Sequence, residues 1–371
     1  HTLVNSGAIA ELTSLVNVTG NYSQSAGALL IDYGTGQLAI SGVASVTGGT
    51  IAMINISISP NGLVGQTFGA GPVITGTTGS SYTGLTYNSN IQGMEITGSV
   101  ANNSLYLVGL NDYVGTVLGS LGNSGTLSAT NPVYVGRYGT LGTLNNTGVL
   151  SGSYSGVFNM GSIGTVLSTN SIVGTSFGLF NNGAIAKIDQ ISNSGTLTGR
   201  MGLANTGTIT TLDNSGLLSG DTIAVYSTRE LDTISNSGTI AGNISITGGQ
   251  ALTLVGGLGA AGLFTGAGGS VGVITNTTAD LVLASGALQL NDVINVGSHT
   301  VANTGATVNL LTALSITGNY SQSAGTLGLA NGAQLAVSGT ASLTGGAVVA
   351  TLSSTVNYLA GQVGPTLMTG G

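Results

Sequence analysis

The sequence predicts an all-β solenoid, and three observations support this fold class. A seven-residue phrase, apolar-x-Asn-x-Gly-x-apolar, recurs at intervals of roughly 9 to 13 residues and returns at about 22. Only 4% of the residues are charged, against roughly 25% in a typical soluble domain. Glycine accounts for 65 of the 371 residues. A surface helix needs a charged face that this composition does not supply, whereas short strands with Gly and Asn corners fit it.

Each copy of the phrase is expected to form one corner between two short strands. Asn tolerates the left-handed backbone region and bonds to nearby main chain, and Gly two residues later adopts a positive φ without steric cost. The flanking apolar residues, such as Ile234 and Ile240, then point inward and stack from turn to turn, while the Asn side chains form an amide ladder. The corner residues are Asn5, Gly7, Asn123, Gly125, Asn146, Gly148, Asn193, Gly195, Asn205, Gly207, Asn214, Gly216, Asn236 and Gly238.

The two ends of the chain are copies of one another. The octapeptide GNYSQSAG occupies 20–27 and is repeated without change at 318–325. His1 matches His299, and Gln37 matches Gln334 within the shared phrase QLA-x-SG. We interpret residues 1–73 and 299–371 as duplicated end segments and 121–243 as the regular Asn-x-Gly region. With no linker or charge run between them, residues 1–371 are expected to form one continuous stack of about 17 turns, at about 22 residues per turn.

Charge and cysteine content narrow the function classes. The net charge is −7 and no basic patch exists, so nucleic-acid binding, which needs clustered Lys and Arg, is not expected. There is no cysteine, and therefore no disulfide framework and no thiol chemistry. The sequence has no uninterrupted run of about 18 apolar residues, so no membrane helix is predicted.

Catalytic groups are sparse. The only histidines, His1 and His299, hold the same place in two copies and are therefore expected to be repeat residues. No catalytic, cofactor or metal site is predicted, and we expect the chain not to be an enzyme. The best polar cluster is interpreted as a solvated face or an ion-paired turn, with a weak cation or glycan site as the alternative. Its members are Lys187, Asp189, Asp213, Asp221, Arg229, Glu230 and Asp232.

Within that cluster, a spacing of about 22 residues per turn would nearly align Asp189 with Asp213. Seven tyrosines form a second candidate group, either a stripe for carbohydrate stacking or self-association, or a partly buried structural set. These are Tyr82, Tyr87, Tyr106, Tyr113, Tyr134, Tyr138 and Tyr154.

The repeats resemble those of a known family. The phrase ISNSGTIAG at 234–242, the GNYSQSAG strands and the ending YLAGQVGPTLM at 358–368 resemble bacterial autotransporter passenger domains. The resemblance implies a right-handed parallel β-helix that is secreted through the outer membrane and displayed on, or released from, the cell surface. The outer-membrane barrel of such systems would serve only as a translocator before release. No such barrel is recognised in this sequence, so we expect a cleaved product or a fragment.

These observations favour a non-enzymatic, extracellular, self-associating structural protein. The chain has too few charged residues for electrostatic repulsion to keep the molecules apart. No charged cap is recognised at either end, and the ends carry the same repeat. Head-to-tail stacking of copies would then build a surface fibre, a biofilm matrix or an adhesion filament. The alternatives are a monomeric adhesin stalk, with cell-surface glycans as its partners, and a glycan-active β-helix enzyme that uses the acids between 187 and 232.

Overall fold

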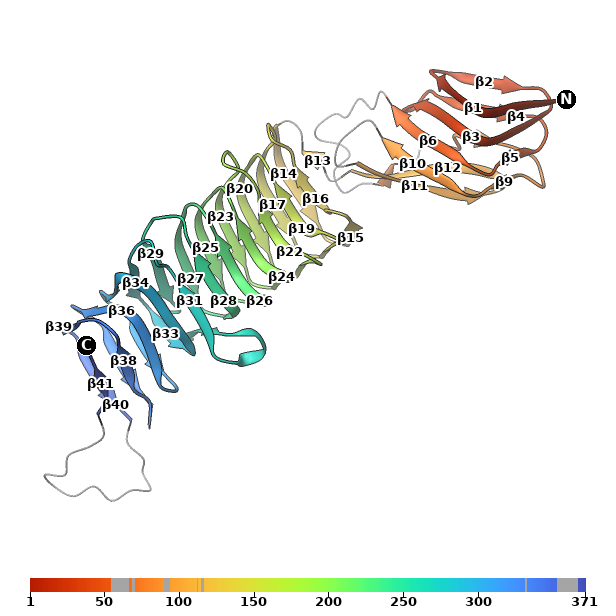
Figure 1. Cartoon of the computed structure of the whole chain (residues 1–371). Coiled ribbons are helices and arrows are strands. Elements are labelled where there is room, and N and C mark those ends of the chain that lie inside the picture. Colours follow the sequence, from red (N-terminus) through yellow and green to blue (C-terminus); the bar gives the residue numbers. More distant parts are fainter. Residues whose placement is uncertain are drawn as a thin grey trace, which may run out of the picture. The chain divides into compact units, whose positions relative to one another are not determined.

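The computed structural model describes residues 1–54, 67–68, 71–89, 94–111, 113–114, 117–330, 332–351 and 366–371. The chain divides into two compact units, an N-terminal unit (1–114) and a C-terminal unit (115–371), which are described separately (Figure 1). The described secondary structure is almost entirely strand, with a single 3-10 turn, η1 (Ala267–Gly269). The all-β prediction is therefore confirmed. No helix among the described residues has the length and apolarity needed to cross a membrane.

The C-terminal unit is a parallel β-solenoid with three strands in each turn. A strand pairs in parallel with the strand at the same position one turn later. For example, Leu141 pairs with Ile163, and Ile163 pairs with Ile188 in the next turn. The strands therefore form three stacks, each a sheet that runs along the solenoid (Figure 1). The β-solenoid predicted from the repeat is confirmed.

The first stack carries the Asn-x-Gly phrase at the end of its strands in the regular part. It consists of β14 (Val117–Asn123), β17 (Thr140–Asn146), β20 (Ser162–Ser168), β23 (Lys187–Asn193), β25 (Thr208–Asn214), β27 (Leu231–Asn236), β29 (Leu252–Gly256), β32 (Leu281–Ser285), the last residues of β34 (Asp292–Asn303) and β36 (Leu314–Gln322), and β39 (Ala341–Leu343).

The second stack follows at the next face. It consists of β15 (Thr126–Ala129), β18 (Val149–Gly152), β21 (Ser171–Gly174), the first residues of β24 (Thr196–Asn205), β26 (Leu217–Ser227) and β28 (Thr239–Ile246), then β30 (Gly262–Thr265), β33 (Ala287–Leu290), β35 (Thr307–Leu310), β37 (Thr326–Leu329) and β40 (Ala347–Ala350).

The third stack closes each turn. It consists of β16 (Val133–Val135), β19 (Ser155–Asn159), β22 (Phe177–Asn181), the last residues of β24, β26 and β28, β31 (Gly272–Thr275), the first residues of β34 and β36, β38 (Leu335–Val337) and β41 (Met368–Thr369).

The core is a set of apolar columns along the inside of the solenoid. Alternate residues of each strand point inward, and those at equal positions stack on one another across turns. The column Leu144, Val166, Ile191, Leu212 and Ile234 is almost fully buried. Burial of each such side chain contributes about 1.5 to 3 kcal/mol, so a single turn cannot be stable alone but a stack can.

The corner asparagines form two ladders of buried side chains. In the first, Asn123 donates from Nδ2 to Asn146 Oδ1 at 2.8 Å, and Asn193, Asn214 and Asn236 continue the same pattern at 2.8 and 2.9 Å. A second ladder joins three more asparagines at the end of the third stack. It consists of Asn159, Asn181 and Asn205, with Nδ2 to Oδ1 distances of 2.7 and 2.8 Å.

The role expected of the corner glycines is wrong. None of the corner glycines named above has a positive φ, and the only described non-glycine residues that have one are Asn102 and Asn103. Instead, at Gly148, Gly195, Gly207, Gly216 and Gly238 the preceding turn lies so close that no side chain fits, whereas a Cβ on Gly7 or Gly125 would meet nothing within 4 Å. A Cβ on Gly148 would collide with the carbonyl oxygen of Gly125, and one on Gly238 with that of Gly216. Glycine is therefore required here by the spacing between turns.

The N-terminal unit begins as the same kind of solenoid and then departs from it. In one sheet, β1 pairs with β3, which pairs with both β5 and β6, and these pair in turn with β9 and β10. In a second sheet, β2 pairs with β4, and β4 pairs with β8. The hairpin β11–β12 is antiparallel, turns at Asn102 and Asn103, and pairs antiparallel with β7 and β8. Two consecutive residues with positive φ suit the right-handed twist of a two-residue hairpin turn.

The bounds of these strands complete the fold. They are β1 (Thr2–Leu12), β2 (Leu15–Val18), β3 (Asn21–Asp32), β4 (Gln37–Ile40), β5 (Ala44–Val46), β6 (Gly49–Ile54), β7 (Thr67–Phe68), β8 (Ile74–Thr75), β9 (Ser81–Tyr82), β10 (Leu85–Ser89), β11 (Met94–Ala101), β12 (Ser104–Asn111) and β13 (Tyr113–Val114).

The described part of the chain makes about 14 turns, fewer than the 17 expected. The predicted turn length is not the reason, because consecutive ladder residues are 23, 21 and 22 residues apart. Part of the difference arises where described residues leave the stack, as in the β11–β12 hairpin and the excursion around η1.

The duplicated ends adopt the same local structure. Tyr22 donates its hydroxyl to Gln24 Oε1 at 2.7 Å, and Tyr320 donates to Gln322 Oε1 at 2.8 Å. Their strand registers correspond as well. Leu38 pairs with Ile74 in the first copy, and Leu335 pairs with Met368 in the second. The two ends also share the dipeptide Gly-Gln, at 65–66 and 361–362, but both copies lie outside the described residues, as does most of the 358–368 phrase.

Candidate functional site

The structure does not bring the predicted polar cluster together. Lys187 Nζ contacts Asp189 Oδ1 at 2.7 Å within β23, with both side chains about half exposed. Asp213 pairs in register with Ser192 rather than with Asp189, so the two carboxylates are not aligned. Asp213 instead accepts a hydrogen bond from Gln190 Nε2 at 2.7 Å. The half-exposed ion pair of Lys187 and Asp189 contributes about 0 to 1 kcal/mol to stability.

The other members of the cluster are distributed around the turn. Glu230 accepts from Thr208 Oγ1 at 3.1 Å near the first stack, next to Arg229 and close to Asp232 in sequence. Asp221 lies within β26, between the parts of that strand that belong to the second and third stacks. Across the described ranges, no three His, Asp or Glu side chains gather in a way that could hold a metal ion. Asp112, another of the acids, lies outside the described residues.

The histidines have structural neighbours. His299 Nδ1 lies 3.8 Å from Asp280 Oδ1, and the same oxygen accepts the Thr300 backbone N–H at 2.9 Å. The carbonyl oxygen of His1 accepts a hydrogen bond from the Asn21 backbone N–H at 2.9 Å. These contacts join neighbouring turns.

The tyrosines do not form one stripe. Tyr82 is buried in the N-terminal unit and donates its hydroxyl to the Asn103 carbonyl oxygen at 2.9 Å. Burial raises the pKa of Tyr82 and of Tyr87. Tyr106 is half-buried, and the side chain of Tyr113 lies outside the described residues. Tyr138 is exposed beside Arg137, whose guanidinium carbon lies 5.9 Å from the ring centroid.

The remaining two tyrosines belong to an aromatic cluster on the third stack. Tyr134 stacks on Phe158 with ring centroids 5.2 Å apart, and Phe158 meets Phe180 edge-on at 5.3 Å. Tyr154 contacts Phe177, which stacks on Phe180 at 4.4 Å. Tyr134, Phe158 and Phe180 occupy equal positions in successive turns. The rings of the cluster bury part of their surface against one another, which stabilises the stack. Sequence reasoning missed the phenylalanines, although Phe158 and Phe180 are one turn apart.

Asp292 is a buried carboxyl group that the sequence pattern did not reveal. It begins β34, points into the core, and is 1% exposed. Its Oδ1 accepts the Gly272 backbone N–H at 3.0 Å, whereas its buried Oδ2 has no hydrogen-bond partner. Burial raises the pKa of Asp292 from 3.8 to about 7, against a smaller lowering by the Gly272 hydrogen bond. A carboxyl group with this environment is sensitive to pH near neutrality.

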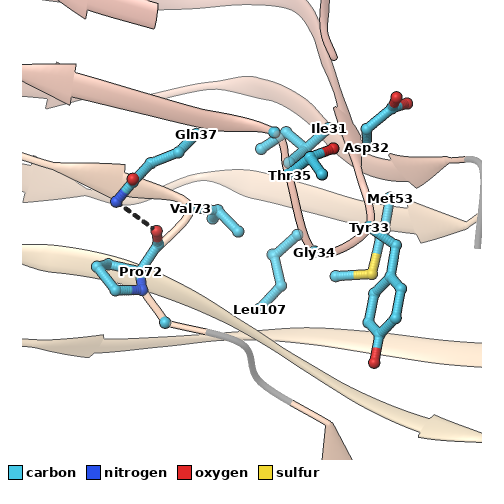
Figure 2. Close-up of a pocket in the computed structure, with 12 residues that line it drawn as sticks. Ile31, Asp32, Tyr33, Gly34, Thr35, Gln37, Met53, Pro72, Val73 and Leu107 are labelled. Atoms are coloured by element: carbon cyan, nitrogen blue, oxygen red, sulfur yellow. Dashed lines mark hydrogen bonds between the residues drawn. The ribbon is translucent and has the colours of Figure 1, made fainter. Parts of the chain in front are cut away.

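A small pocket of about 210 Å³ opens in the N-terminal unit (Figure 2). Its apolar part is formed by Ile31, Met53, Val73 and Leu107. The opposite part is the turn 32–36 between β3 and β4, together with polar atoms at Pro72, shortly before β8. The polar side chains are those of Asp32, Tyr33, Thr35 and Gln37, and Pro72 adds its carbonyl oxygen.

The turn of the pocket is fixed by main-chain hydrogen bonds. The Asp32 carbonyl oxygen accepts the backbone N–H of Thr35 at 3.3 Å and of Gly36 at 2.9 Å, and Gly34 has a φ of 77°. Gln37 donates from Nε2 to the Pro72 carbonyl oxygen at 2.9 Å, which joins the two polar sides of the pocket (Figure 2).

Comparison with known proteins adds no family to these observations. The chain matches no family model, no curated protein and no solved structure.

Proposed function

We propose that this chain is a non-enzymatic, extracellular structural protein that self-associates by head-to-tail stacking of its solenoid turns. The resulting assembly would serve as a surface fibre, a biofilm matrix or an adhesion filament. The extracellular role rests on the resemblance of the repeats to autotransporter passengers. The observation that carries self-association is the apolar surface on the edge strands of residues 1–18 and 341–350, compared with the buried equivalents in the other copy.

The first edge consists of β1 and β2. Among the described strands, β1 pairs only with β3 and β2 only with β4, so each has one edge without a strand partner. Leu3 is 53% exposed, whereas Val301, its equivalent in the second copy, is fully buried because β32 covers it. Val16 is also exposed, whereas its equivalent Leu314 is buried.

The second edge consists of β39 and β40, which pair only with β36 and β37 among the described strands. Leu343 is 49% exposed, whereas its equivalent Val46 is fully buried beneath β9. Val348 is 41% exposed, whereas its equivalent Ile51 is fully buried beneath β10. Each edge thus shows side chains that the fold buries wherever another turn follows, and open parallel edges pair with further strands.

The registers of the two copies suggest how the edges would meet. In the C-terminal unit, Asn303 pairs with Gln322, and Gln322 pairs with Leu343. Because Asn5 is the equivalent of Asn303, continuing this register places Asn5 of a second copy beside Leu343. The same continuation places β1 along β39 and β40. This contact is heterologous, so each copy keeps its other edge available for a further copy.

Edge substitutions test this proposal. We expect the chain with Leu343→Asp and Val348→Asp to associate at least about tenfold more weakly than the unmodified chain, because burying two carboxylates opposes stacking. Sedimentation velocity over a range of concentrations measures the change. Leu217→Asp is the matched control, since Leu217 is a partly exposed apolar residue on the outside of β26, away from both edges.

A mixing experiment separates head-to-tail stacking from other association. Leu3→Asp with Val16→Asp disables the first edge, and Leu343→Asp with Val348→Asp disables the second. Each variant alone is expected to remain monomeric, and an equimolar mixture is expected to form a 1:1 dimer through the two intact edges. A monomeric unmodified chain at every concentration, or equal assembly by all variants, would overturn the proposal.

A further inference from the structure

The pocket of the N-terminal unit lies where the solenoid pattern is interrupted. Leu107 comes from β12, which pairs antiparallel with β8 instead of continuing the parallel stack. Figure 2 shows Leu107, Val73 and Met53 facing the turn that carries Gly34 and Thr35. Binding residues are commonly held on loops that a rigid scaffold positions, and an irregular element on a solenoid provides such a place.

The internal duplication shows that the lining of this pocket is not a requirement of the fold. The two copies share GNYSQSAG before the turn and QLA-x-SG after it, yet they differ in the turn itself. The first copy reads Asp-Tyr-Gly-Thr-Gly at 32–36, and the second reads Ala-Asn-Gly-Ala at 330–333. In sequence, the second copy therefore joins the equivalent strands with a segment that is one residue shorter and lacks the Asp, Tyr and Thr side chains.

The polar side of the pocket favours a ligand that donates hydrogen bonds. The Nε2 of Gln37 is already bonded to the Pro72 carbonyl, which leaves Gln37 Oε1 as an acceptor, and the Thr35 hydroxyl can donate or accept. No basic side chain is among the described lining residues, so an anionic ligand would find no counter-charge. The carboxylate of Asp32 lies on the outer side of the turn, away from Leu107 (Figure 2).

Size and shape restrict the ligand further. A volume of about 210 Å³ is below the roughly 300 to 1,000 Å³ of pockets for drug-sized molecules, so it suits one ring. A neutral sugar ring presents C–H groups on a face and hydroxyl donors at its edge. The first would contact Val73, Met53 and Leu107, and the second would reach Thr35, Gln37 and main-chain carbonyl oxygens.

We propose that the pocket lined by the turn 32–36, Gln37, Val73 and Leu107 binds a single neutral sugar residue. No described lining residue belongs to the edge strands 1–18 and 341–350 that the self-association proposal uses, so either proposal can fail without the other. A pocket this small and open to solvent makes few contacts, so we expect a dissociation constant in the millimolar range.

Saturation-transfer NMR on the full chain tests this proposal. The probes are methyl glucoside, methyl mannoside, methyl galactoside and N-acetylglucosamine, with glucuronate and choline as the charged probes. In the first variant, 32–36 is replaced by the Ala-Asn-Gly-Ala turn of the second copy, which the same fold already accepts. In the second variant, Thr35→Trp, an exposed position carries an indole large enough to fill the pocket.

We expect at least one neutral sugar to bind the unmodified chain and both variants to lose at least about tenfold in affinity. The control variant replaces 330–333 with Asp-Tyr-Gly-Thr-Gly and should bind as the unmodified chain does. Circular dichroism shows whether each variant keeps its strand content. The proposal is overturned if no neutral probe binds, if only glucuronate or choline binds, or if both folded pocket variants bind as well as the unmodified chain.

Discussion

Replacing Asn214 by Ala is expected to lower the free energy of unfolding by about 2 to 4 kcal/mol, because it removes a buried amide and leaves its partners unpaired. The Asn214 Nδ2 group donates to Asn236 Oδ1 at 2.9 Å and to the Thr239 carbonyl oxygen at 3.1 Å. Its Oδ1 accepts from Asn193 Nδ2 at 2.8 Å. Urea unfolding followed by circular dichroism measures the loss. Asn145→Ala, at an exposed position of β17, is the control and should change stability by less than about 0.5 kcal/mol.

The same ladder contains a natural interruption that predicts a gain. Ser168 occupies the ladder position between Asn146 and Asn193, and its Oγ accepts from Asn146 Nδ2 at 3.1 Å. It does not reach the next turn, and Asn193 Oδ1 is buried without a partner. Ser168→Asn should supply the missing Nδ2 donor and stabilise the chain by about 1 kcal/mol. Destabilisation by Ser168→Asn, or no effect of Asn214→Ala, would contradict the role assigned to the ladder.

Stability is expected to fall as pH rises from about 4 to about 8, with Asp292 as the main cause. Burial raises the pKa of Asp292 from 3.8 to about 7, so the folded state keeps a proton that the unfolded state has released. The stabilisation is fully present below the unfolded pKa and is lost as pH rises through the folded pKa. A shift of this size corresponds to up to about 4 kcal/mol. The residues at its register position in the adjacent turns, Gly272 and Leu314, carry no charge.

Asp292→Asn isolates this effect. The amide can still accept the Gly272 N–H through its oxygen but does not titrate, so we expect its unfolding free energy to vary little between pH 4 and pH 8. At pH 8 the variant should be more stable than the unmodified chain. Asp213→Asn, which changes an outward-facing acid bonded to Gln190, should keep the pH dependence of the unmodified chain. A flat pH profile of the unmodified chain would refute the assignment.

The repeat predicted the parallel turns and their length because one short phrase sets both the corner and the inward apolar pair. It did not predict why glycine is needed. The close approach of Gly148 to Gly125 depends on the spacing between turns, which a single turn does not reveal. The alignment expected for Asp189 and Asp213 also failed. Turn lengths vary by a few residues, and a shift of three residues along β23 places Ser192 opposite Asp213.

Features outside the repeat were less accessible to sequence reasoning. The β11–β12 hairpin depends on two consecutive asparagines, Asn102 and Asn103, and these were not recognised as a turn. Asp292 occupies an inward position that the pattern reserves for apolar residues, so only the strand register reveals its burial. The pocket combines a turn of the first copy with Leu107 of the hairpin, and neither segment indicates a site by itself.

Electron microscopy of the purified chain at physiological salt tests head-to-tail stacking most directly. The account predicts unbranched filaments of varying length whose axial repeat is that of one molecule. These filaments should persist at high salt, because apolar contacts and main-chain hydrogen bonds join the edges and almost no charge is involved. The variant with Leu343→Asp and Val348→Asp should show only separate particles. Separate particles of the unmodified chain at every concentration would contradict the account.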